Sequence, residues 1–164
     1  MKAEFLRLLA TLHRHEVEFV VVGGVAAVVE GAIVNTQDLD VVYSNRQANL
    51  ERVLAALQSL DCVYRDPAER VIRPTVDRLR ENRMNLLRGT AGDIDVMQRI
   101  APGWTFADVL VRSHPLEIAG MSIRVLDLAS VIESKTALGR PKDLAALPVL
   151  RNTLEMRERR KPLP

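Results

Sequence analysis

The sequence is poor in cysteine, in aromatic residues and in net charge, and each shortage excludes a class of protein. Cys62 is the only cysteine among 164 residues, so no internal disulfide can form, which is usual in reducing compartments. Aromatic residues make up 4% of the chain, too few for an extended platform on which nucleic-acid bases stack. The formal net charge of +2 permits an anionic ligand but does not require one.

Long apolar runs are also absent. No uninterrupted run approaches the roughly 20 residues that a membrane-spanning helix needs, so we expect no membrane partner. Glu4 and Arg7 interrupt the start of the chain, which excludes the apolar region of a secretory signal peptide. With 48% apolar residues the chain can bury a core, and we expect one cytoplasmic domain over 1–164. Its core would span about 16–126, with a helical segment over about 127–160.

Hydrophobic periodicity predicts an α/β fold in which helices flank a mixed β-sheet. Apolar residues at helical spacing predict helices over 2–15, 46–60, 128–139 and 141–160, and a brief helix over 25–31. Runs of β-branched residues predict strands within 17–24 and 38–43, and hairpins within 83–98 and 115–126. The segment 62–83 is ambiguous and is expected to hold a strand stub, a helical turn and a loop. Pro148 marks a break or kink in the last helix.

Two carboxylates lie inside the predicted strand 38–43. Residues i and i+2 of a strand point to the same face, so Asp38 and Asp40 project together. Carboxylates that close repel each other, and the pKa of one of them is normally raised. A divalent cation removes this penalty, and Mg²⁺ in particular takes carboxylate oxygens together with substrate phosphates. The alternative is a pair of exposed carboxylates on a solvent-facing strand.

Two glycines, Gly23 and Gly24, end an apolar strand directly before a predicted helix. Without a Cβ, their backbone N–H groups can approach an anion closely. The helix expected from about Val25 adds its positive end. A tight strand-to-helix turn would need the same glycines, and the two uses are compatible. The segment predicts a phosphate-binding turn that faces the two carboxylates.

This arrangement resembles the signature of the nucleotidyltransferase superfamily of DNA polymerase beta. The sequence VGG at 22–24 is followed, after thirteen residues, by DLD at 38–40. The resemblance implies a third carboxylate from a later strand, for which GDIDVM offers Asp95, with Asp93 on the same face as the alternative. It also implies that Asp95 takes the proton of the acceptor.

The likeness continues near the end of the chain. The stretch KTALGRPKDLAAL is similar to the K-x-x-x-G-R-x-K-D segment of small bacterial nucleotidyltransferases, including those similar to AbiEii-type toxins. This similarity implies that Lys135, Arg140 and Lys142 contact the nucleotide. Asp143 completes the segment, and it also suits the first turn of a helix.

The resemblance implies Mg²⁺-dependent transfer of a nucleoside monophosphate from an NTP to an acceptor hydroxyl. Asp38, Asp40 and Asp95 would be the catalytic and metal-binding residues, while Gly23 and Gly24 would contact the β- and γ-phosphates. The acceptor is expected to be RNA or protein.

Two other functions fit the same sequence. One is the toxin of a toxin–antitoxin pair, which would act on tRNA or protein and bind an antitoxin partner. The other is a binding module without catalysis, because the family pattern often has an arginine where this chain has Asn35. A group of arginines in the middle of the chain is either a solvated face or a rim that guides RNA: Arg65, Arg70, Arg73, Arg78, Arg80, Arg83 and Arg88.

Overall fold

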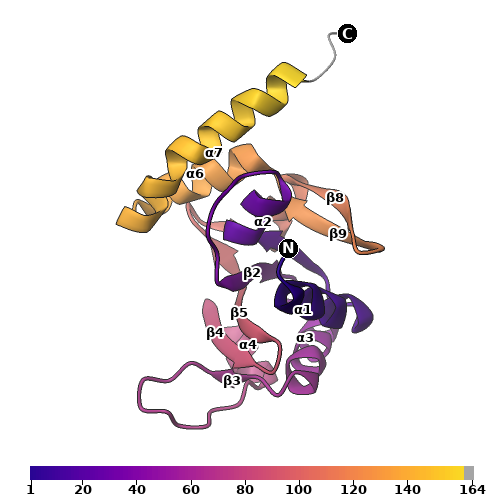
Figure 1. Ribbon diagram of the computed structural model, residues 1–164. Helices are drawn as coiled ribbons and strands as arrows, with labels where there is room; N and C mark the ends of the chain where they lie inside the picture. The colour runs from indigo at the N-terminus through magenta and orange to yellow at the C-terminus, as the bar shows by residue number, and fades with distance from the viewer. Residues whose placement is uncertain (161–164) are drawn as a thin grey trace.

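The computed structural model describes residues 1–160 and arranges them around a seven-stranded mixed sheet (Figure 1). The strand order is β3-β4-β5-β2-β1-β9-β8. The strands are β1 (Phe19–Val22), β2 (Asp38–Tyr43), β3 (Val63–Tyr64), β4 (Met84–Gly89), β5 (Gly92–Met97), β8 (Ser113–Ile118) and β9 (Met121–Leu126). A separate two-stranded sheet pairs β6 (Arg99–Ile100) with β7 (Trp104–Thr105).

The centre of the sheet mixes parallel and antiparallel pairs. Strand β1 pairs antiparallel with β2 and parallel with β9, while β2 pairs parallel with β5. The hairpins β4–β5 and β8–β9 are antiparallel. The predicted mixed sheet and both predicted hairpins are confirmed.

Seven helices accompany the sheet in residues 1–160. They are α1 (Ala3–Arg14), α2 (Gly23–Val29), α3 (Gln47–Ser59), α4 (Val76–Glu81), α5 (Phe106–Val111), α6 (Leu128–Leu138) and α7 (Pro141–Arg160). The brief helix begins at Gly23 instead of Val25, and α7 spans the predicted 141–160 with Pro148 inside it, so Pro148 does not break the helix. Within 1–160, none of these helices combines the length and hydropathy needed to cross a membrane.

The core lies where the apolar residues of the sequence pattern meet. All four residues of β1 are buried, as expected for a strand covered on both faces. The apolar stripe of α1 is buried as well, at Phe5, Leu8, Leu9 and Leu12. Burying each such side chain contributes about 1.5–3 kcal/mol to the free energy of unfolding. This core fixes the strands that carry the site.

One face of the sheet stays open beside β5. Burial alternates along β4, so that Asn85 and Leu87 are buried while Met84, Leu86 and Arg88 are exposed. The exposed residues Leu86 and Arg88 pair across the ladder with Asp95 and Asp93. The face that carries these two aspartates is therefore the accessible one.

Helix α7 is attached to the fold near both of its ends. Near its start, Asp143 accepts a hydrogen bond from Lys135 of α6. Near its end, Arg157 forms an ion pair with the buried Glu30, which directly follows α2. The Nε2 atom of His114 lies 2.8 Å from the other carboxylate oxygen of Glu30. These contacts hold α6 and α7 on the same side as α2 (Figure 1).

Candidate active site

Four carboxylates gather on one face of the sheet. The parallel register of β2 and β5 places Asp38 opposite Asp93 and Asp40 opposite Asp95. Residues paired in this way point to the same face, so all four side chains share it. The other face of β2 carries Leu39, which is fully buried. The chain thus brings together acids that are more than fifty residues apart in sequence.

Two of these carboxylates are poorly stabilised in their charged form. Burial, followed by the nearby charges of Asp95 and Asp38, raises the pKa of Asp40 to about 7. Burial also raises the pKa of Asp95 to about 6, although the charge of Arg65 acts in the opposite direction. Asp40 and Asp95 are therefore ready to accept either a proton or a cation near neutral pH.

Asp93 is distinguished from Asp95 by its partner. Arg88 grips the Asp93 carboxylate through two nitrogens, with Nε 2.7 Å from Oδ1 and a terminal nitrogen 2.9 Å from Oδ2. This hydrogen-bonded pair holds the pKa of Asp93 below its usual value. Asp95 also has a cation, Arg65, but the parallel ladder places Asp95, and not Asp93, opposite Asp40. Asp95 therefore remains the predicted third acid of the site.

Arg65 lies within the carboxylate cluster. One terminal nitrogen of its guanidinium is 3.2 Å from Oδ2 of Asp38 and 3.3 Å from Oδ2 of Asp93. The other terminal nitrogen donates a hydrogen bond to Asp95. The sequence interpretation placed Arg65 and Arg88 on a solvated face or an RNA-guiding rim, and it missed their contact with the acids.

The remaining arginines of that group fit the solvated face better. Three of them form exposed ion pairs with neighbouring aspartates, and such pairs contribute little to stability. These pairs are Arg70 with Asp66, Arg73 with Asp61 and Arg80 with Asp77.

The two glycines are required by their neighbours. Val22 pairs with Asp40, which places Gly23 against the Asp40 side chain. A Cβ on Gly23 would lie 3.0 Å from Cγ of Asp40, and its φ of +61° is one that residues with side chains rarely adopt. A Cβ on Gly24 would lie 2.6 Å from Oγ1 of Thr36. The turn therefore has room for Asp40 and Thr36 only because both positions lack a side chain.

The C-terminal segment supplies cations that face the acids. Lys135 donates a hydrogen bond of 3.1 Å to Asp143, and Arg140 donates bonds of 2.5 and 3.3 Å to the same carboxylate. Lys135 lowers the pKa of Asp40, and Asp40 in turn raises the pKa of Arg140. The basic pair and the acidic pair therefore lie within electrostatic reach of each other.

Asp143 is the centre of this segment, although the sequence assigned it no site role. Its side chain is only 1% exposed. Burial raises its pKa, but the hydrogen bonds from Arg140 and Lys135 outweigh that effect and hold the pKa below its usual value. The side chain of Lys142 is exposed, and within 1–160 it makes no hydrogen bond or ion pair, so its role stays a prediction.

A cavity of about 510 Å³ adjoins the carboxylate cluster. Arg65 and Arg88, which both contact the acids, contribute to its wall. The other residues that line it come mainly from β3 and the loop that follows: Val63, Tyr64, Asp66, Pro67, Glu69, Arg70 and Val71.

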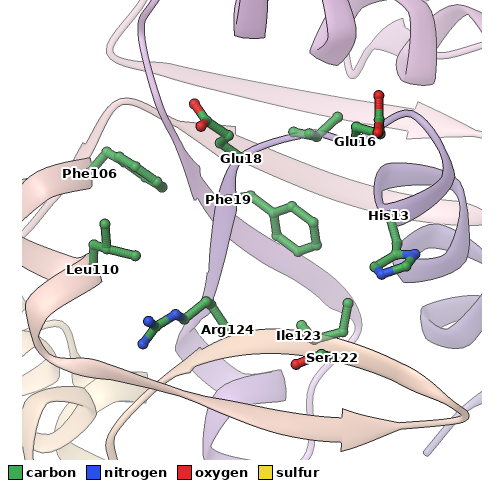
Figure 2. Close-up of a pocket in the computed structure, with 10 residues that line it drawn as sticks. His13, Glu16, Glu18, Phe19, Phe106, Leu110, Ser122, Ile123 and Arg124 are labelled. Atoms are coloured by element: carbon green, nitrogen blue, oxygen red, sulfur yellow. The ribbon is translucent and has the colours of Figure 1, made fainter.

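A second cavity, of about 480 Å³, lies elsewhere (Figure 2). Phe19, Phe106 and Leu110 form part of its wall, together with His13 and Arg124. Phe19 opens β1, whereas the glycine turn follows the last residue of that strand. This cavity therefore lies at the opposite end of β1 from the carboxylates and is not part of their site.

The carboxylate oxygens of the site suit a hard metal ion, but Arg65 is hydrogen-bonded to two of the acids. Asp38, Asp40 and Asp95 offer only carboxylate oxygens, which Mg²⁺ prefers. As they stand, no three acidic, histidine or cysteine side chains within 1–160 converge on a point where an ion could sit. Arg65 donates hydrogen bonds to Oδ2 of Asp38 and Oδ1 of Asp95, and these bonds would have to open before an ion could use those two oxygens.

Comparison with solved structures supports the fold. A protein from Thermotoga maritima assigned as a nucleotidyltransferase is 18% identical, with a TM-score of 0.59 over 93% of this chain and 95% of that chain. The lincosamide antibiotic adenylyltransferase LnuA, solved with lincomycin, is 12% identical, with a TM-score of 0.62 over 93% and 98%. The antibiotic-resistance factor ANT(2'')-Ia is 12% identical, with a TM-score of 0.60 over 92% and 82%. At such identities these likenesses show the fold alone.

The family is shown by the sequence itself. No curated protein matches the chain significantly. The model of the aminoglycoside-2''-adenylyltransferase family, however, matches residues 4–141. That range includes the glycine turn, the four aspartates of the sheet and the first part of the basic segment. The chain therefore belongs to the aminoglycoside-2''-adenylyltransferase family, and so to the nucleotidyltransferases.

Proposed function

We propose that the protein transfers a nucleoside monophosphate from an NTP to a hydroxyl group of an acceptor, with Mg²⁺ bound by Asp38, Asp40 and Asp95. One observation carries this proposal: Asp40 and Asp95, which have raised pKa values, share a face of the sheet, and Asp40 lies within electrostatic reach of Lys135 of α6 and of Arg140 just before α7. The family match supports nucleotidyl transfer, and the adenylyltransferase names of the family and its relatives make ATP the first NTP to test.

In the proposed reaction the acceptor oxygen attacks the α-phosphorus of the NTP. A new P–O bond forms, the bond to the β-phosphate oxygen breaks, and pyrophosphate leaves. The proton of the acceptor hydroxyl passes to Asp95, whose raised pKa of about 6 makes it a stronger base than an ordinary aspartate. Bound Mg²⁺ would supply charge neutralisation for the triphosphate.

The basic segment would act on the leaving group. Lys135 and Arg140 are held by Asp143 and need no rearrangement to present positive charge to the pyrophosphate. Gly23 lies against the side chain of Asp40, and the backbone N–H of Gly24 donates a hydrogen bond to it, so the proposed triphosphate site lies beside this carboxylate. Positioning and charge neutralisation would together supply the catalysis.

Nucleotide binding can be tested without knowledge of the acceptor. Saturating ATP and Mg²⁺, at about 100 times their Kd, should stabilise the protein by about 2.7 kcal/mol. For a chain of this length that corresponds to a rise in Tm of roughly 5–10 °C. If no NTP together with Mg²⁺ changes the Tm, the proposal is wrong.

Transfer itself requires an acceptor screen. The protein would be incubated with Mg²⁺ and each α-labelled NTP, in turn with an aminoglycoside, a lincosamide, total RNA and a protein extract. We expect label on one acceptor class and release of pyrophosphate, both absent in Asp40→Asn. Label transfer that survives in Asp40→Asn would refute the assigned site.

A further inference from the structure

Arg65 already engages one oxygen each of Asp38 and Asp95, two of the three acids that the proposed function assigns to a metal. Its guanidinium contacts Asp38, Asp93 and Asp95, and its side chain is only 24% exposed. We propose that Arg65 and a divalent cation are alternative counter-ions of Asp38 and Asp95, so that metal binding displaces the guanidinium. This inference rests on the proposed function, because it takes these aspartates as metal ligands.

The charges of the cluster explain why Arg65 is there. When ionised, the four aspartates of β2 and β5 carry four negative charges on one face. Arg88 offsets Asp93, and Lys135 and Arg140 are bound to Asp143. Arg65 is therefore the cation in direct contact with Asp38 and Asp95. Without it, no contacting cation within 1–160 would offset the repulsion between these two carboxylates.

Arg65 and a metal ion exclude each other for two reasons. The hydrogen bonds of the guanidinium engage Oδ2 of Asp38 and Oδ1 of Asp95, so those lone pairs are not free for coordination. Two cations held a few ångströms apart in a partly desolvated site also repel strongly. An ion that coordinates both of these oxygens must therefore displace Arg65, and the free energy of breaking its hydrogen bonds lowers the observed affinity of the ion.

The surroundings allow this displacement without a change of fold. The backbone N–H of Arg65 donates a 3.0 Å hydrogen bond to the carbonyl of Leu86, which anchors the chain to β4. The side chain lines the cavity of about 510 Å³ beside the cluster, so a released guanidinium has space to enter. The backbone can stay in place while the side chain turns.

The test measures binding of Mn²⁺, a probe for Mg²⁺ sites, to the full chain without nucleotide at about pH 8. We expect Arg65→Gln to bind Mn²⁺ at least about tenfold more tightly than the unchanged protein. Arg73→Gln removes the same charge from an exposed pair with Asp61 and is expected to change the affinity less than about twofold. Electron paramagnetic resonance or calorimetry gives both values.

Arg65→Lys keeps the charge but loses the forked hydrogen bonds, so its Mn²⁺ affinity should lie between those of the unchanged protein and Arg65→Gln. Circular dichroism checks that each variant is folded. Equal or weaker Mn²⁺ binding by Arg65→Gln, or no binding by either protein, overturns the inference.

The proposed function is judged separately. If the unchanged protein transfers label but Arg65→Gln gains no Mn²⁺ affinity, the inference about Arg65 is wrong and the proposed function stands. A gain of Mn²⁺ affinity without transfer to any acceptor supports the inference and counts against the function.

Discussion

Two carboxylates on which Lys135 acts, Asp40 and Asp143, are held in opposite ways. Asp143 is fully buried, accepts hydrogen bonds from two cations, and has a lowered pKa. Asp40 keeps some exposed surface, receives no hydrogen bond or ion pair from another side chain within 1–160, and has a pKa raised to about 7. Two side-chain cations compensate the charge of Asp143, whereas Asp40, among residues 1–160, accepts a hydrogen bond only from the backbone N–H of Gly24.

The difference separates an acid that holds the structure together from one that the proposed function assigns to a metal. Breaking a compensated buried ion pair destabilises the packing of the elements that it joins, here α6 with Lys135 and α7 with Asp143. A desolvated carboxylate beside two others costs stability, and folded proteins keep such arrangements mainly at functional sites. Three predictions test whether Asp40 and Asp143 differ in this way.

The largest expected effect is loss of catalysis in Asp40→Asn. Asparagine keeps the shape of the side chain but cannot supply the negative charge that a metal or triphosphate site needs. We expect nucleotide transfer to fall by at least about 10³-fold, corresponding to about 4 kcal/mol in the activation free energy. Single-turnover label transfer measures the loss.

Asp77→Asn is the matched control, because Asp77 is an exposed residue of α4 whose partner is Arg80. It should retain activity within about twofold. Activity of Asp40→Asn close to that of the control would show that the unsatisfied carboxylate has no catalytic role.

The next largest effect is loss of stability in Asp143→Asn. The change leaves Lys135 and Arg140 without their shared anion, and only Arg140 is well exposed to water. We expect the free energy of unfolding to fall by about 2–3 kcal/mol and the KM for the NTP to rise. Chemical denaturation and steady-state kinetics provide the two readouts. A stability equal to that of Asp77→Asn would end the view of Asp143 as a structural anion.

The smallest effect is a gain of stability in Asp40→Asn without metal. The pKa of Asp40 is about 7 in the folded chain and 3.8 in a model peptide, so the folded state holds more protons between these values. Stability therefore falls as pH rises from about 4 to 7, and Asn removes this loss. We expect a gain of about 1–2 kcal/mol at about pH 8 that disappears near pH 4.

The contribution of Asp143 to stability depends on pH in the opposite direction. Because its folded pKa is lowered, its contribution is present above the unfolded value and is lost as pH falls through the lowered pKa. Unfolding of Asp40→Asn and Asp143→Asn in a chelator, followed from about pH 2 to pH 8, measures both slopes, since the Asp143 contribution changes only below about pH 4. Parallel slopes for the two variants would contradict the comparison.

Much of the acidic half of the site could be predicted from sequence because its signals are local. The spacing of Asp38 and Asp40 fixes a common face on any strand, and a glycine pair after an apolar run marks a turn. The hairpin of β4 and β5 followed from the turn at 89–92. These patterns need no knowledge of distant contacts.

The contacts of Arg65 could not be predicted in the same way. Arg65 follows β3, a strand of only two residues that carries no periodic signal, and its acidic partners come from strands β2 and β5. Asp143 looked like an ordinary first-turn acid, because its burial depends on how α7 packs against α6. Helix α5, β6 and β7 were missed since each spans six residues or fewer.

The parallel pairing of β2 with β5, and the position of Lys135 on α6, have a consequence for biosynthesis. A ribosome delivers Asp40 first, Asp95 some fifty residues later, and Lys135 and Arg140 after that. Until residue 140 has been made, Arg65 and Arg88 are the cations that contact the acids of β2 and β5, and the basic pair is missing. The site can therefore be complete only after the segment that joins α6 to α7 has been synthesised.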